Sequence, residues 1–230
     1  IGLGIPAEPL FRSRSVSFPS LTGNFCFMFT AAPYAWSFFL TVLAVRLFLG
    51  EGWRGAGLSL FALVLALGIY QAYISVAASL FLLVMIRDTL DGERSVGEII
   101  RFGVKALAMM LAAVAIYYGI TLLVLRMAGT AFNGYVTENV NGAVSLPRRV
   151  RMAYDAFYYI FSFRNFCLIT SEASRYIHIA LGIQHLGALG LLALRCRSLL
   201  RTALLGGLLI LLPLSICCMF LIMSRESIHT

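Results

Sequence analysis

Charged side chains are scarce in this 230-residue chain. Asp, Glu, Lys and Arg together make up 12% of the residues, whereas hydrophobic residues make up 60%. Soluble domains are typically about 25% charged and about 45 to 50% apolar, so this composition excludes an ordinary soluble domain. Because a chain in lipid must satisfy its own backbone hydrogen bonds, we expect an all-α fold, a polytopic transmembrane helix bundle formed by the whole chain, 1–230.

Sequence motifs of soluble enzymes are also missing. The chain has no Walker loop, no HExxH and no nucleophile elbow, so we expect no cofactor and identify no metal site, while a divalent metal stays open. The net charge is +8, but the arginines lie mainly in links between apolar runs. This placement favours contact with membrane lipids over binding of nucleic acid. The first residues lack the order of a signal peptide, and a start at Ile1 suggests a fragment of a longer protein.

Cysteines are few and lack CxxC spacing, so we interpret them as small apolar side chains. They are Cys26, Cys167, Cys196, Cys217 and Cys218.

Apolar runs predict about five to six membrane segments. These runs cover residues 25–48, 56–86, 106–125, 176–194 and 202–223. Basic residues are favoured in short cytoplasmic loops, so the charged links 87–105 and 195–201 are expected on the cytoplasmic side. The polar insertion 127–172 is then expected outside.

The run 56–86 is unusual because it contains 31 residues without a charge and a polar centre, Gly68–Ser75. A single crossing needs roughly 20 residues, so the run is long for one helix and short for two. One tilted helix would place the amide of Gln71 near mid-membrane, at a cost of several kcal/mol if unpaired. We favour a hairpin or broken helix, which places Tyr70 and Tyr73 at an interface.

Tyr70, Gln71 and Tyr73 are therefore candidate substrate-binding residues, since polar side chains in membrane runs often line a wet cavity. The alternative is a simple interhelical hydrogen bond from Gln71 with two interfacial tyrosines.

Within the insertion, Ser145-Leu146-Pro147 predicts a helix start with proline just inside the cap. Aromatic residues then recur at three- and four-residue spacing, which indicates an interfacial helix. Arg148, Arg149 and Arg151 are candidate ligands of a lipid phosphate, because a guanidinium binds phosphate through two parallel donors. General contact with anionic headgroups is the alternative.

A catalytic base on the outer side could be Glu138, Asp155 or Glu172, but spacing selects none of them, and a surface role is favoured for each. His178 and His185 lie two helical turns apart in the run 176–194, where helix packing is favoured over a metal site.

The segments Phe27-Met28-Phe29-Thr30-Ala31 and Leu67-Gly68-Ile69-Tyr70-Gln71-Ala72-Tyr73-Ile74-Ser75 resemble the bacterial glucosyltransferase II family, the O-antigen-modifying membrane enzymes. The resemblance covers about residues 17–125 by motif and the rest by hydropathy. It implies a GT-C type multi-pass enzyme of the bacterial cytoplasmic membrane. Such an enzyme transfers a sugar, here glucose, from a polyprenyl-phosphate-linked donor to a polysaccharide acceptor such as O-antigen.

The resemblance also implies an acidic catalytic residue in the first outer loop. No carboxylate lies between Glu8 and Glu51, so we expect that loop upstream of Ile1. The alternatives are a flippase or transporter of polysaccharide or lipid-linked sugar, for which internal repeats would be evidence, and a non-catalytic membrane scaffold.

Overall fold

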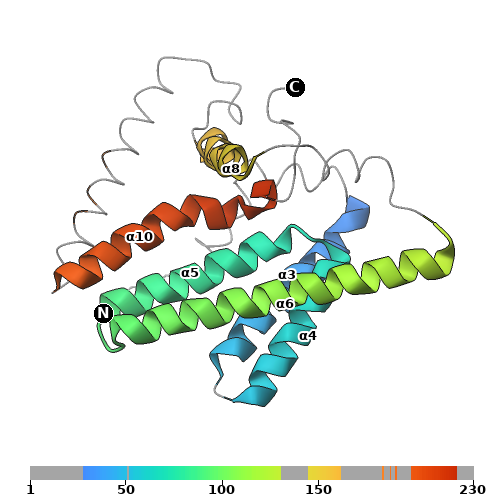
Figure 1. The fold of residues 1–230 in the computed structure, drawn as a ribbon, viewed down its shortest axis with the longest axis horizontal. Coiled ribbons are helices and arrows are strands. Elements are labelled where there is room, and N and C mark those ends of the chain that lie inside the picture. The colour runs from blue at the N-terminus through green and yellow to red at the C-terminus, as the bar shows by residue number, and fades with distance from the viewer. Residues whose placement is uncertain are drawn as a thin grey trace, which may run out of the picture.

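The computed structural model describes residues 28–50, 52–130, 145–161 and 198–221, with isolated positions at 183, 187 and 190. This described part is entirely helical, which confirms the predicted fold class (Figure 1). Its elements are α3 (Met28–Leu49), α4 (Trp53–Ile69), α5 (Tyr73–Asp91), α6 (Val96–Ala128), α8 (Leu146–Phe161), α10 (Leu199–Ile216) and the 3-10 helix η1 (Cys218–Leu221). Apart from these isolated positions, the run 176–194, with His178 and His185, lies outside the described residues.

Among the described residues, four helices are long and apolar enough to cross a membrane. They span Ala31–Leu49, Tyr73–Asp91, Val96–Ala128 and Leu199–Ile216. Helix α4 is apolar but has 17 residues, fewer than the roughly 20 that a full crossing needs.

The apolar run 56–86 is two helices, as the broken-helix hypothesis predicted. Helix α4 ends at Ile69, Tyr70 is extended with φ −156° and ψ 114°, and α5 begins at Tyr73. The two helices diverge from the break and make few contacts with each other (Figure 1). Both pack against α3 and α6, α4 mainly along α3, and α5 also packs along α10. The run is therefore a broken helix, and not a closely packed hairpin.

The charged link 87–105 is shorter than its composition suggested. Helix α5 continues to Asp91, Gly92 ends it in the left-handed region with φ 76°, and α6 begins at Val96. Ser95 and Glu98 form a reciprocal capping box, which satisfies backbone N–H groups at the start of α6. Helix α6 has 33 residues and so is about 50 Å long, which exceeds the roughly 30 Å of a hydrocarbon core.

Small residues hold the helices close together. The core around α3, α4, α5 and α6 includes Ala44, Ala62, Ala77 and Ala113, each nearly or fully buried. Buried hydroxyls add hydrogen bonds between helices, and Ser59 Oγ donates to the carbonyl oxygen of Ala44 at 2.7 Å. Packing in lipid depends on such close approach and on polar contacts between helices, because lipid tails are as apolar as the side chains.

The turn between α3 and α4 is rich in glycine. Gly50, Gly52 and Gly55 have the spacing G-x-G-x-x-G, but they join two helices, whereas a dinucleotide-binding fingerprint follows a strand. Gly50 and Gly55 allow close packing, since a Cβ on Gly55 would lie 2.8 Å from the carbonyl oxygen of Leu47. Gly52 instead adopts φ 121°, a backbone conformation that favours glycine.

Helix α10 runs antiparallel to α5. Side chains at its start and just after its end contact the two ends of α5. At one end, Arg201 donates to the carbonyl oxygens of Gly92 and Arg94, both at 2.9 Å, and of Thr89 at 3.4 Å. At the other end, Ser75 Oγ lies 3.2 Å from Cys218 Sγ. The α5–α6 turn and the start of α10 therefore share one end, as predicted for the two charged links. That this end is cytoplasmic stays a prediction.

Candidate functional site

Tyrosines gather at the break between α4 and α5. The ring of Tyr70 lies 4.7 Å from that of Tyr34 on α3 and 5.7 Å from that of Tyr73. Phe38, one turn after Tyr34, lies 6.2 Å from Tyr73 between ring centroids. These contacts join the start of α3 to the break and form an aromatic cluster there.

Gln71 projects from the same break toward α6. Its Nε2 donates to the hydroxyl of Tyr117 at 2.6 Å, and the pair is exposed. The predicted interhelical hydrogen bond is thus present. The amide also has a second N–H and a carbonyl oxygen that no described residue engages, so both are available to a ligand. We call Tyr34, Tyr70, Gln71, Tyr73 and Tyr117 the break cluster.

Two members of the break cluster, Tyr34 and Tyr117, were missed by the sequence analysis. Tyr34 follows Pro33 near the start of an apolar run, and Tyr117 stands beside Tyr118 within another. Tyrosine at such a position is typical of a membrane interface, and this was the signal available. Which tyrosines meet depends on how α3, α5 and α6 pack.

Helix α8 begins as predicted, with Pro147 in its first turn, and it crosses the C-terminal part of α10 (Figure 1). Its most buried face consists of Met152, Ala153 and Ala156, and the two alanines pack against Cys217. The predicted aromatic stripe is less buried, because small residues allow the closest approach to α10. Tyr154 fixes the crossing by donating its hydroxyl to the carbonyl oxygen of Ile210 at 2.6 Å.

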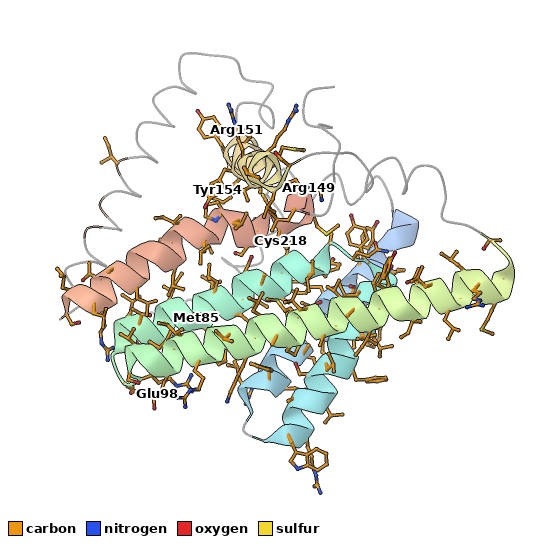
Figure 2. The ribbon with its side chains drawn as sticks, in the orientation of Figure 1. Met85, Glu98, Arg149, Arg151, Tyr154 and Cys218 are labelled. Carbon is orange, nitrogen blue, oxygen red and sulfur yellow. The ribbon has the colours of Figure 1, made fainter. Side chains whose placement is uncertain are left out.

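The three arginines of α8 divide into two groups. Arg148 and Arg151 line a cavity of about 550 Å³ with Pro147, Met152 and Asp155. Arg149 instead lies beside η1, where its Nη1 donates to the carbonyl oxygen of Leu221 at 2.9 Å (Figure 2). The structure therefore brings Arg148 and Arg151 to one cavity and gives Arg149 a contact with the end of η1.

Asp155 is the one candidate carboxylate of the insertion within the described residues. It lies 3.7 Å from Arg151, and both side chains are largely exposed, at 65% and 83%. This exposed pair agrees with the predicted surface role, because such pairs contribute little to stability.

The α8 cavity and the break cluster lie at the same end of the bundle. Ser75, two residues after Tyr73, contacts Cys218 of η1, and Arg149 of α8 contacts Leu221 of η1. Figure 2 shows Cys218 and Arg149 close to the crossing of α8 over α10. Both groups of candidate residues are thus opposite the end that Arg201 ties to the α5–α6 turn.

Cys217 agrees with the interpretation of the cysteines as small apolar side chains. It is buried just after α10 and packs against Ala153 and Ala156. Across the described ranges, no three His, Cys, Asp or Glu side chains are grouped as a metal site would require.

Comparison with protein families gives one match over nearly the whole chain. The family model described as Glucosyl transferase GtrII matches residues 12–230. Curated proteins and solved structures give no match.

Proposed function

We propose, because the chain belongs to the glucosyl transferase GtrII family, that it transfers glucose from a polyprenyl-phosphate-linked donor to a cell-surface polysaccharide such as O-antigen. The family makes the protein a membrane glucosyltransferase with a sugar donor and an acceptor. The lipid donor, the polysaccharide acceptor and a location in the bacterial inner membrane are our proposal. Family membership also favours transfer over the transport alternative.

The observation that carries the proposal is the shared end of the α8 cavity and the break cluster. A lipid-linked sugar has a phosphate at the membrane surface and a sugar beside it. Arg148 and Arg151 supply charged donors for the phosphate, since guanidinium groups bind phosphate through paired hydrogen bonds. The amide of Gln71 and the tyrosine hydroxyls supply neutral donors and acceptors of the kind that sugar hydroxyls need.

In the proposed reaction, an acceptor hydroxyl attacks the anomeric carbon of the donor glucose. The bond between that carbon and the phosphate oxygen breaks, a glycosidic bond forms, and a base takes the hydroxyl proton. The lipid phosphate leaves with the bonding electron pair and so gains negative charge. Arginines beside it stabilise this charge, which is most valuable in the transition state.

The test is a transfer assay with the full-length protein in vesicles that contain a polyprenyl-phosphate-linked glucose. The double variant R148Q/R151Q removes both cavity arginines, and R126Q removes an exposed arginine at the end of α6. Hydrogen bonds to charged groups contribute about 1.5 to 3 kcal/mol each, so loss of one such bond from each arginine should lower kcat/KM of the double variant by at least about 150-fold.

The control R126Q should stay close to wild type. Equal donor affinity and turnover in R148Q/R151Q would reject the phosphate assignment. A similar loss in both variants would indicate a general effect of surface charge instead.

A further inference from the structure

The outer surface of α3 and α5 has a groove that the proposed reaction does not use. It has a volume of about 340 Å³, and most of its lining is aliphatic. The lining residues are Val42, Val45, Arg46, Leu49, Leu80, Leu83, Val84 and Arg87. The groove thus combines an apolar wall from two membrane helices with two cationic side chains.

These two arginines are far from the break cluster. Arg46 lies 12 residues beyond Tyr34 on α3, and Arg87 lies 14 residues beyond Tyr73 on α5. At 1.5 Å per residue these separations are about 18 and 21 Å along the helices. The arginines therefore belong to the end of the bundle near the α5–α6 turn, away from the α8 cavity.

The charge at this end of the groove is only partly balanced. Arg46 is exposed and forms no ion pair with any described residue. Arg87 lies 2.9 Å from Asp88 and 3.9 Å from Asp91, but Arg94 also holds Asp88, at 2.7 Å. The carboxylate of Asp88 is therefore shared by two arginines. Arg87 itself is 62% exposed and can contact another anion.

We propose that this groove is a binding site for an anionic phospholipid. One acyl chain lies along the valines and leucines, and the phosphate group lies between the guanidinium groups of Arg46 and Arg87. Charge complementarity selects the occupant, because arginine binds phosphate through paired donors and a headgroup with a net negative charge offsets the positive charge that Asp88 and Asp91 leave unbalanced. Anionic lipids are enriched in the cytoplasmic leaflet, and the sequence predicts that this end of the bundle is cytoplasmic.

The site differs from that of the lipid-linked donor, because the α8 arginines lie at the opposite end of the bundle. It also does not depend on the proposed reaction, since lipid binding can be measured without a sugar substrate. The two proposals therefore fail or hold separately.

The experiment measures lipid retained by the purified full-length protein. The protein is incubated in detergent with equal amounts of phosphatidylglycerol and phosphatidylcholine that have identical acyl chains, and bound lipid is counted by native mass spectrometry. The variants are R46Q and R46Q/R87Q. The control R54Q removes an exposed arginine at the start of α4, which lies over the ring of Trp53 and outside the groove.

We expect the ratio of bound phosphatidylglycerol to phosphatidylcholine to fall about fivefold for each groove arginine that is removed, and to stay unchanged in R54Q. The variant L83W keeps both charges and fills the groove at an exposed position, so it should reduce retention of both lipids. R46Q and L83W keep Arg87 and Arg94, the two arginines that contact Asp88. Their results therefore test the proposal even if R46Q/R87Q fails to fold.

An unchanged ratio in R46Q would overturn the proposal, and so would an equal fall in R54Q, which would indicate general surface charge. Unchanged retention in L83W would show that the acyl chain lies elsewhere or that another segment of the chain covers the groove.

Discussion

Substitutions at Gln71 and Tyr117 separate a structural role for the break cluster from a role in binding sugar. The Gln71 amide donates one hydrogen bond of 2.6 Å to Tyr117, and this pair is exposed. Interhelical hydrogen bonds in membrane proteins contribute about 0.6 kcal/mol on average. We therefore expect Y117F and Q71A each to reduce the free energy of unfolding by about 0.6 kcal/mol. Because both remove the same hydrogen bond, the double variant should lose little more than either single variant.

Catalysis should respond differently. Q71A removes the second N–H and the carbonyl oxygen of the amide as well, whereas Y117F leaves the amide in place. If each of these two groups bonds a sugar hydroxyl for about 0.5 to 1.5 kcal/mol, Q71A loses about 5- to 150-fold in kcat/KM. Y117F should lose less than about fivefold.

The assay is glucose transfer in vesicles, paired with unfolding in mixed micelles for the two single variants and the double variant. The double-mutant cycle gives the coupling between the two side chains directly. Equal losses of activity in Q71A and Y117F would refute the reasoning, because Gln71 would then act only as a link between the break and α6. Wild-type turnover in Q71A would refute it as well.

Two further predictions concern the scaffold. R201M removes the side chain that donates to the carbonyl oxygens of Thr89, Gly92 and Arg94, and we expect thermal unfolding in detergent to show a loss of about 1.5 to 3 kcal/mol, with R201K recovering part of it. An unchanged melting temperature in R201M would contradict this role. G55A places a Cβ 2.8 Å from the carbonyl oxygen of Leu47, whereas G57A meets no atom within 4 Å, so G55A should destabilise the protein by about 1 to 3 kcal/mol and G57A should be neutral or stabilising. Equal melting temperatures for these two variants would show that α3 moves away without cost.

Composition and hydropathy predicted much of the fold. The first and last apolar runs in the described part agree with α3 and α10, and the polar residues within 56–86 predicted the break near Tyr70. These features depend on local chemistry, since a helix in lipid needs an apolar length and a polar segment there must find a partner. The extent of α6 was missed because the charged residues after Ser95 were assigned to the link before the apolar run 106–125, although the capping box at Ser95 and Glu98 starts α6 there.

The candidate site could be predicted only in part. Tyr70, Gln71 and Tyr73 are adjacent in sequence, and so they stay together in any fold. Arg148, Arg149 and Arg151 are also adjacent, but a helix turns by about 100° per residue, so near neighbours point in different directions. The packing of α8 against α10 and η1 then decides that Arg149 contacts Leu221 while Arg148 and Arg151 line a cavity.

The sequence by itself determined that this protein is a helical membrane bundle of the GtrII family. It also favoured a break in the run 56–86 and showed which side chains there are polar. Tertiary structure decided which distant residues join them. Tyr34 and Tyr117 reach the break because α3 and α6 pack beside it, and Arg46 and Arg87 share a groove because α3 and α5 lie together. The physical reason is range: hydropathy and caps act over a few residues, whereas contacts between residues dozens of positions apart depend on how whole helices pack.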